Sequence, residues 1–196
     1  MSLQINYKNS YLKNKIDNLV LFTDESFNIL HLKKHILSNE YAFINDLLKA
    51  SDKKNKIISY DISSKKKIIL VSINKNFGSS DFEGLGAKFY DQIKNIKQNI
   101  FIINSDTIKN TPKNFTGYFL HGIKLKSYIF EKYKSKKRKK KITIDVIGKN
   151  IPSKADQLKF KAVEDGTFYA RDLVSEPGNI LHPDEYAKRL NSLKKT

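Results

Sequence analysis

The chain of 196 residues has no cysteine, no tryptophan and only 4 prolines. Without cysteine, a disulfide framework and metal sites with thiolate ligands are excluded. No apolar run approaches the roughly 20 residues that a membrane-spanning helix needs. The first residues also lack the basic segment and apolar core of a secretory signal. We therefore expect a soluble, cytoplasmic protein with no membrane partner.

Acidic residues are few beside the basic ones. The chain has 20 Asp and Glu against 37 Lys and Arg, a formal net charge of +17. Such a charge is typical of proteins that bind nucleic acid or anionic membranes. Lysine, isoleucine and asparagine are abundant along the whole chain, however, while arginine is scarce. We favour a general compositional bias, with lysines spread over solvent-exposed faces, as the source of most of the charge.

Strand-like and helix-like segments alternate along the chain. β-rich runs predict strands at residues 18–22, 57–62, 67–73, 99–104 and 142–147. Helical patterns begin near Ser38, a candidate cap, near Ser80 and Glu83, which have capping-box spacing, and at Thr111. The second and third strands flank a short polar turn and are expected to pair as a hairpin. This alternation predicts a three-layer α/β sandwich.

A long helical pattern covers residues 155–174. Its apolar residues form two adjacent stripes, which are Leu158, Ala162, Gly166, Tyr169 and Leu173, and Phe160, Val163, Thr167, Ala170 and Val174. Polar residues occupy the remaining wedge, namely Lys161, Glu164, Asp165, Arg171, Asp172 and Ser175. The apolar surface is wider than the stripe of an ordinary surface helix, so we expect two layers or two domains to clamp this helix. Gly166 weakens helix propensity and suggests close packing there.

The end of this helix carries the most specific pattern of the chain. Pro177-Gly178-Asn179 ends the helix, and His182-Pro183 starts another. The stretch resembles the one that opens the catalytic domain of the leucyl (cytosol) aminopeptidases. The matching residues are Ala170, Arg171, Asp172, Leu173, Glu176, Pro177, Asn179, Leu181, Pro183, Tyr186 and Ala187. Two positions depart from the family pattern, because Ser175 replaces a common Asn and His182 a common Thr.

A second segment, 122–134, resembles the family pattern G-x-x-L-x-x-Y-x-F-x-x-Y-K. The resemblance implies a macro-domain-like N-terminal domain, with a mixed sheet between helices, over residues 1–152. A linker helix would follow at 153–176, and residues 177–196 would begin the catalytic domain. Because Thr196 falls inside a helical pattern, we expect the chain to be a fragment of a longer enzyme.

The resemblance also implies an activity for that longer enzyme. Family members release N-terminal residues, often leucine, from peptides with two divalent metal ions, zinc or manganese, and form hexamers. Two such ions share carboxylates to activate a water molecule. The family's Asp, Glu and Lys ligands lie in its C-terminal domain, around an Asn-Thr-Asp-Ala-Glu-Gly-Arg-Leu stretch that this chain lacks. We therefore expect no catalytic, cofactor-binding or metal-binding residue in this chain. The fragment should be inactive by itself, with its own catalytic domain as its partner.

The histidines and one acidic pair offer other candidate sites. His31 and His35 have the i, i+4 spacing of metal ligands on one helix face, but no Glu follows the first of them, so we favour a pair of surface histidines. His121 is expected to be structural or solvent-facing, and His182 to help start a helix. Asp172 and Glu176 are expected to be solvated or paired with Arg171 or Lys188.

Glycines suggest a nucleotide site only weakly. Gly84-Leu85-Gly86 resembles a phosphate-binding turn, but it lies inside a helical pattern rather than between a strand and a helix. Gly78 is better placed for backbone N–H groups to face an anion.

The run 132–141 is a block of lysines with one arginine. Its lysines could bind phosphates, and Tyr128, Phe130 and Tyr133 could stack on bases. We favour a solvated loop whose neighbouring aromatic residues are core positions. The alternative function that this run suggests is a stand-alone basic α/β module that binds nucleic acid or nucleotides.

Overall fold

The computed structural model describes residues 2–8, 18–107, 112, 114–136 and 140–193. Its sheet has six strands in the order β1-β6-β5-β2-β4-β3. The strands are β1 (Ser2–Tyr7), β2 (Asn18–Thr23), β3 (Ile57–Asp61), β4 (Lys67–Ser72), β5 (Ile100–Asn104) and β6 (Lys141–Ile147). The helices are α1 (Ser38–Ala50), α2 (Ser79–Ile93), α3 (Phe115–Lys126), α4 (Lys154–Ser175) and α5 (Pro183–Ser192), with 3-10 turns η1 (Leu30–Lys34) and η2 (Ser105–Thr107).

The sheet is mixed. Every neighbouring pair of strands is parallel except β3 and β4, which pair antiparallel as the expected hairpin. The central strands β2 and β4 are almost wholly buried, as uninterrupted apolar runs require when both faces of a sheet are covered. The predicted α/β class and its mixed sheet are confirmed.

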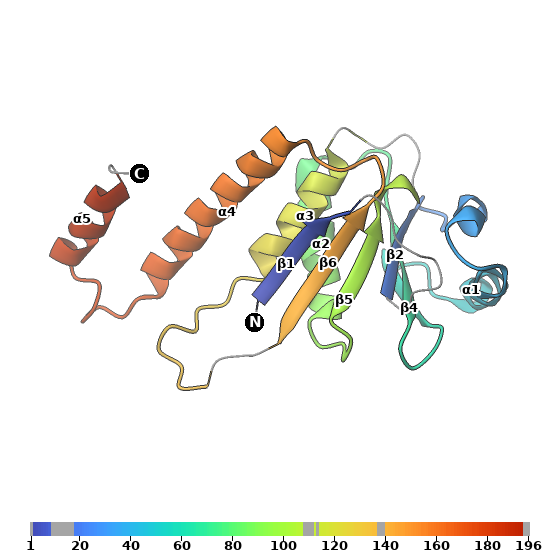
Figure 1. Ribbon diagram of the computed structural model, residues 1–196, viewed down its shortest axis with the longest axis horizontal. Helices are drawn as coiled ribbons and strands as arrows, with labels where there is room; N and C mark the ends of the chain where they lie inside the picture. The colour runs from blue at the N-terminus through green and yellow to red at the C-terminus, as the bar shows by residue number, and fades with distance from the viewer. Residues whose placement is uncertain (1, 9–17, 108–111, 113, 137–139, 194–196) are drawn as a thin grey trace.

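Helices cover both faces of this sheet (Figure 1). One core cluster joins the sheet to α2 and α3, and a second joins its other face to α1 and η1. Phe22 of β2 contacts both Phe115 and Phe119 of α3 edge-on, with ring centroids 5.3 and 5.4 Å apart. The three layers expected from the sequence are therefore present.

Strand β1 is an element that the sequence did not predict. It lies at one edge of the sheet and pairs in parallel with β6, with Ile5 opposite Ile144. Leu3 and Ile5 pack against the α2–α3 core, whereas Gln4 and Asn6 alternate to the other face. An edge strand that alternates polar and apolar residues over only six positions has a weak sequence signal.

Three helix starts differ from the expected caps. Glu40 faces the backbone N–H of Leu37 at 3.4 Å, so Leu37 rather than Ser38 is the N-cap of α1. Gly78 is the N-cap of α2, and its N–H donates to the Asp81 carboxylate at 2.9 Å, which replaces the expected Ser80–Glu83 box. The expected start of α3 at Thr111 lies outside the described residues, and its helical turns begin at Phe115.

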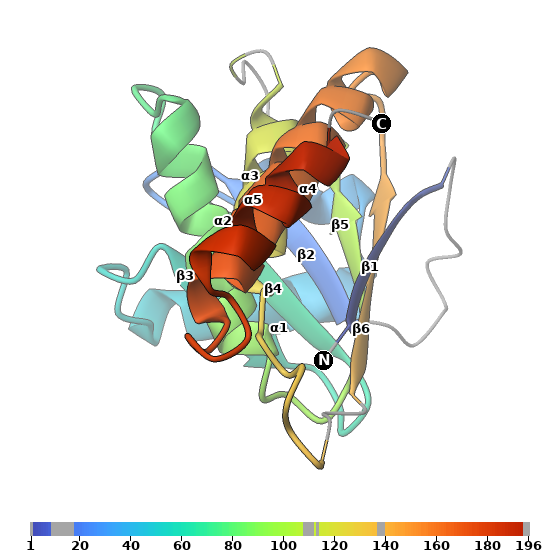
Figure 2. The ribbon, with the colours of Figure 1, turned by 90° about the vertical axis from the view of Figure 1, so that its left-hand side faces the viewer.

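Helix α4 lies outside α3, so it forms a partial further layer on that side of the molecule (Figure 2). The Ser153 hydroxyl accepts a hydrogen bond from the Asp156 N–H and caps α4, close to the expected start of this helix. After a short connection, α5 lies beyond α4 (Figure 1). In the part of the chain that the structure describes, no helix combines the length and apolar character needed to cross a bilayer.

Candidate functional site at helix α4

The inner face of α4 meets α3 through an aromatic ring laid over a glycine. A β-carbon on Gly117 would lie 2.5 Å from Cε2 of Phe160. The Phe160 ring also contacts Tyr118 edge-on at a centroid distance of 5.3 Å and lies 5.2 Å from the His121 ring. The missing side chain on α3 therefore creates the space that the Phe160 ring fills.

Polar contacts on the same face join α4 to α3. His121 Nδ1 lies 3.0 Å from Glu164 Oε1, and both side chains are largely buried. Burial raises the pKa of Glu164, and the hydrogen bond and charge of His121 offset this only partly. Arg171 Nη1 donates to the Leu125 carbonyl at 2.6 Å, and its guanidinium lies 5.5 Å from the Tyr128 ring centre. Two residues of the polar wedge, Glu164 and Arg171, therefore find partners on α3.

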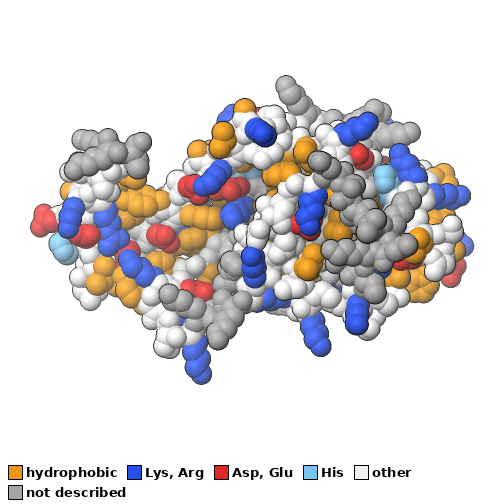
Figure 3. Space-filling model, viewed as in Figure 1, with side chains coloured by type: hydrophobic (Ala, Val, Ile, Leu, Met, Phe, Trp, Pro, Cys, Tyr) orange, Lys and Arg blue, Asp and Glu red, His pale blue; other side chains and the backbone are white. Residues whose placement is uncertain are grey.

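The two apolar stripes of α4 are divided between its faces, because Phe160 of the second stripe packs on α3 while other members of both stripes face solvent. Leu158, Val163 and Val174 are exposed, Val174 to 87%. A β-carbon on Gly166 would meet no described atom within 4 Å, so the close packing expected there is not found within the described chain. Leu173 is buried, and hydrophobic side chains gather where α4 and α5 approach each other in Figure 3. Within the described residues, the second cover of α4 is therefore only partial.

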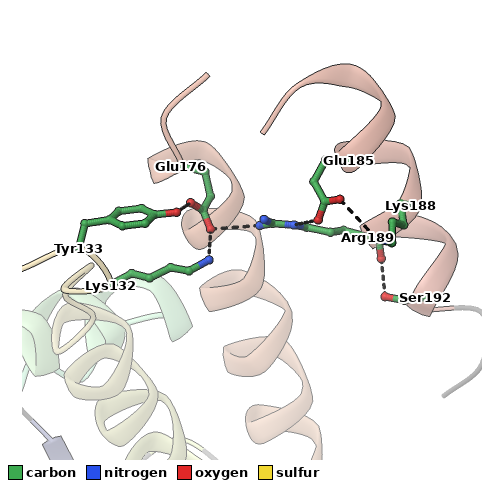
Figure 4. A network of polar contacts seen from close by, with 7 residues as sticks. All are labelled: Lys132, Tyr133, Glu176, Glu185, Lys188, Arg189 and Ser192. Carbon is green, nitrogen blue, oxygen red and sulfur yellow. Dashed lines mark hydrogen bonds and ion pairs between the residues drawn. The ribbon is translucent and has the colours of Figure 1, made fainter. Parts of the chain in front are cut away.

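Glu176, at the C-cap of α4, joins three segments (Figure 4). Its carboxylate accepts hydrogen bonds from Lys132 and Tyr133, in the segment after α3, and from Arg189 Nη1 of α5 at 3.1 Å. The Glu176 side chain is only 1% exposed. The hydrogen bonds from Lys132, Tyr133 and Arg189 lower the pKa of Glu176 to about 2. Arg189 is itself held by Glu185 at 3.0 Å.

These contacts correct the expected partners of the acidic pair. Asp172 accepts a hydrogen bond from the Tyr128 hydroxyl at 2.7 Å. Glu176 pairs with Lys132 and Arg189 rather than with Arg171 or Lys188. The pair is thus a structural anchor at the end of α4, a role that the sequence does not reveal because its partners come from two other segments.

The histidines are not arranged as a metal pair. His31 Nε2 lies 3.3 Å from the Phe22 carbonyl, and His35 Nδ1 lies 3.0 Å from Asn104 Nδ2. Both are partly exposed, so they lie at the surface as expected, but each also contacts the end of a strand, β2 for His31 and β5 for His35. The described residues contain no group of three or more His, Cys, Asp or Glu side chains that could hold a metal ion.

The remaining histidines have local roles. His121 is buried and structural, as expected. His182 is the N-cap of α5, but its ring makes no capping hydrogen bond.

Of the two glycines within α2, Gly86 is a packing position, whereas a β-carbon on Gly84 would meet no described atom within 4 Å. A β-carbon on Gly86 would lie 2.0 Å from the carbonyl oxygen of Phe119 in α3. Gly84 lies in the same helix, as the helical pattern indicated. The Gly78 N–H already donates to Asp81, so it does not face an open anion site.

Part of the basic run is used within the protein. Residues 137–139 lie outside the described residues. Lys132 binds Glu176, and Lys140 Nζ donates to the Lys94 carbonyl at 2.8 Å. The Tyr128 ring lies 5.3 Å from that of Phe168. Tyr128 is therefore packed against α4, whereas Tyr133 is 52% exposed, so the expectation that these aromatic residues are core positions is wrong for Tyr133.

The chain is similar in sequence to several curated proteins. No protein-family model matches the chain. It is 27% identical to a probable cytosol aminopeptidase of Clostridium perfringens over 87% of this chain and 34% of the relative. It is 25% identical to one of Nitrobacter winogradskyi over 90% of this chain and 38% of the relative. A probable cytosol aminopeptidase of Brucella ovis is 32% identical over 66% of this chain and 28% of the relative. The chain thus spans about a third of the length of the curated relatives it matches.

Solved structures share the fold. A mutant tomato leucine aminopeptidase superposes with a TM-score of 0.72 and 17% identity, covering 98% of this chain and 42% of that one. The cytosol aminopeptidase of Coxiella burnetii superposes with a TM-score of 0.61 and 16% identity, and the match covers 96% of this chain and 37% of that one. The bottromycin maturation enzyme BotP, solved in complex with Mn, superposes with a TM-score of 0.63 and 13% identity, and the match covers 91% of this chain and 36% of that one. At these identities, the structures show the fold alone. From the sequence relatives and the fold together, we conclude that this chain is a homologue of the cytosol aminopeptidases and has the fold of the N-terminal region of the leucine aminopeptidases.

Proposed function

We propose that this chain is the N-terminal, non-catalytic domain of a metal-dependent leucyl aminopeptidase that releases N-terminal amino acids from peptides. The observation that carries the proposal is the match of 87% of this chain to 34% of a cytosol aminopeptidase. In this proposal, residues 1–152 form the macro-like domain and residues 153–176 the linker helix. Residues 177–196 then begin the catalytic domain, and the whole enzyme works in the cytoplasm.

The proposal assigns the metal chemistry to the rest of the relatives' length. Two divalent ions, zinc or manganese, need shared carboxylates to activate water and bind the peptide. The acids near α4 have other roles, because Glu164 pairs with His121 and Glu176 with Lys132 and Arg189. We therefore assign assembly and access to the active site, rather than bond cleavage, to this domain.

The outer face of α4 supports a catalytic-domain partner. Leu158, Val163 and Val174 lie exposed on one helix, and exposed large apolar side chains gathered on one element support an interaction site there. Leu173, further along α4, is already buried, and it lines a hollow together with Arg189 of α5. The catalytic domain would continue this cover towards Leu158, and such complete enzymes would assemble as hexamers.

The first experiment is to sequence the gene beyond the codon for Thr196 and to express the continuing frame. We expect the longer protein to hydrolyse leucine p-nitroanilide with Mn²⁺ or Zn²⁺, and EDTA to abolish this activity. The 196-residue chain should show no turnover under the same conditions. Metal-dependent turnover by the 196-residue chain would overturn the non-catalytic assignment, and a stop codon directly after Thr196 would overturn the domain assignment.

A second experiment tests the partner of α4. Leu158→Ser should leave the stability of the 196-residue chain within about 0.5 kcal/mol, because Leu158 is 68% exposed. In the longer protein, the same change should lower the thermal stability and weaken the oligomer. Leu30→Ser is the matched control, since Leu30 is 64% exposed on the opposite side of the sheet. Equal effects of the two changes in the longer protein would contradict the assignment.

A further inference from the structure

A cavity of about 540 Å³ lies between β1, α3 and the N-terminal half of α4. Its apolar lining includes Ile5, Leu120 and Phe160. Small-molecule sites are commonly cavities of about 300–1,000 Å³ with an apolar lining and a few convergent polar groups. The Phe160 ring is held over Gly117, so one apolar wall is fixed by the α3–α4 contact. The cavity thus has the size of a ligand site, and one of its walls is held in place.

Groups of both charges converge on this cavity. Glu164 contributes a carboxylate whose Oε1 is bound by His121, and among the described residues its Oε2 has no hydrogen-bond partner. Lys124 and Lys154 contribute ammonium groups. Lys124 Nζ donates to the Leu3 carbonyl at 3.2 Å, and Lys154 has no ion-pair partner among the described side chains. Lys161 and Asp165, also at the cavity, neutralise each other at 2.8 Å.

The acid and the lysines lie in different environments. The Glu164 side chain is only 14% exposed, and burial raises its pKa. Burial and the nearby Glu164 charge together raise the pKa of Tyr7, another residue of the cavity, to about 12. A cation beside Glu164 would relieve this cost, because an opposite charge stabilises a desolvated carboxylate. Lys154 is exposed at the first turn of α4, where its charge and the positive helix end both favour an anion.

We infer that this cavity binds a free α-amino acid with an apolar side chain. The ammonium group of the ligand would bind Glu164, its carboxylate would bind Lys154, and its side chain would pack on Phe160, Ile5 and Leu120. A simple anion would leave Oε2 of Glu164 without a partner, and a simple amine would leave Lys154 without one. An apolar zwitterion matches both. The inference rests on the cavity alone and does not depend on the aminopeptidase assignment.

The test measures binding to the 196-residue chain by isothermal titration calorimetry and saturation-transfer NMR. The probes are L-leucine, 3-methylbutylamine, which lacks the carboxylate, and 4-methylpentanoate, which lacks the ammonium group. We expect L-leucine to bind more tightly than either analogue, by at least about tenfold, because each analogue loses a charge-assisted contact. Equal affinity of all three, or no binding of L-leucine at millimolar concentration, would overturn the inference.

Two variants identify the groups that bind. Lys154→Gln changes an exposed side chain, so folding should be unaffected, and it should weaken L-leucine and 4-methylpentanoate but not the amine. Lys159→Gln, on the opposite face of α4, is the matched control and should change nothing. Glu164→Gln keeps an oxygen for His121 and should weaken L-leucine and the amine only. If Lys154→Gln binds L-leucine as Lys159→Gln does, the site is not this cavity.

Discussion

Helix α3 makes two contacts with neighbouring helices, and they differ in kind. Against α2, the two backbones touch, because β-carbons on Gly86 and Gly122 would each lie 2.0 Å from a carbonyl oxygen of the other helix. Against α4, one aromatic ring lies over Gly117, and the rest is polar, with the His121–Glu164 pair at its centre. The first contact belongs to the core that holds the sheet. The second attaches a helix that keeps Val163 and Val174 exposed within the described part of the chain.

Of the changes considered for these two contacts, Gly122→Ala at the α2–α3 contact should have the largest effect on stability. Its β-carbon would lie 2.0 Å from the Glu83 carbonyl oxygen, and a backbone atom cannot move aside as a side chain can. We expect a loss of about 3 kcal/mol in the free energy of unfolding, the upper part of the range for overpacking. Urea denaturation followed by circular dichroism measures it.

Gly166→Ala is the matched control for this change. No described atom lies within 4 Å of its added β-carbon, so helix propensity should stabilise the chain by up to about 1 kcal/mol. A loss at Gly166 as large as that at Gly122 would show that the outer face of α4 is not open.

Phe160→Ala should weaken the second contact of α3. The ring is half-buried, so we expect a cost of about 1–2 kcal/mol, below the about 3–5 kcal/mol of a fully buried phenylalanine. Hydrogen exchange should rise in α4 while the amides of β4 stay protected. Phe43→Ala, in α1 and 46% exposed, is the control and should leave α4 unchanged. Uniform exchange throughout the chain would mean that α4 is part of the same cooperative core.

Glu176→Gln should have a more local effect. The change removes the negative charge that Lys132 and Arg189 share, so α5 should lose its fixed position while the sheet keeps its stability. Hydrogen exchange at neutral pH should increase across residues 183–193 only. Asp165→Gln, which removes an exposed pair with Lys161, is a control for loss of an acid on α4. Unchanged exchange in α5 would show that Glu176 does not anchor it.

Acid should reproduce the Glu176→Gln effect in the unchanged protein. The folded-state pKa of Glu176 is about 2, below its ordinary value of 4.5, so its anchor is fully stabilising above about pH 4.5 and is lost as the pH falls towards 2. Pepsin, which works in this range, should cut residues 177–193 faster as the pH falls. The Glu176→Gln variant, compared at each pH, separates this effect from the pH dependence of pepsin, and a parallel rise in both proteins would contradict the prediction.

Much of the fold follows from local sequence signals. Uninterrupted apolar runs predicted β2, β4 and β5, because only a sheet covered on both faces can bury them. The helical pattern from residue 155 and the proline at 183 predicted the approximate starts of α4 and α5. Strand β1 was missed, because its short alternation of residue types is a weak signal and its pairing with β6 spans most of the chain.

The contacts of the candidate site could not be predicted in the same way. The helical projection placed Phe160 in an apolar stripe with Val163 and Val174, and Glu164 and Arg171 in a separate polar wedge, whereas Phe160, Glu164 and Arg171 all face α3. They face α3 because Gly117 makes room for Phe160 and because His121 and the Leu125 carbonyl provide partners. These partners lie more than 40 positions away, so no local pattern reveals them.

The sequence by itself determined the α/β class, the order of most elements and the resemblance to the aminopeptidases. Periodicity, caps and turn residues act over a few positions, and a family pattern is read from residue order alone. Only the tertiary structure decided which face of α4 points inward, which groups anchor Glu176, and that a cavity with both charges lies beside β1. Those features depend on distances between segments far apart in the chain, which packing sets and sequence spacing does not.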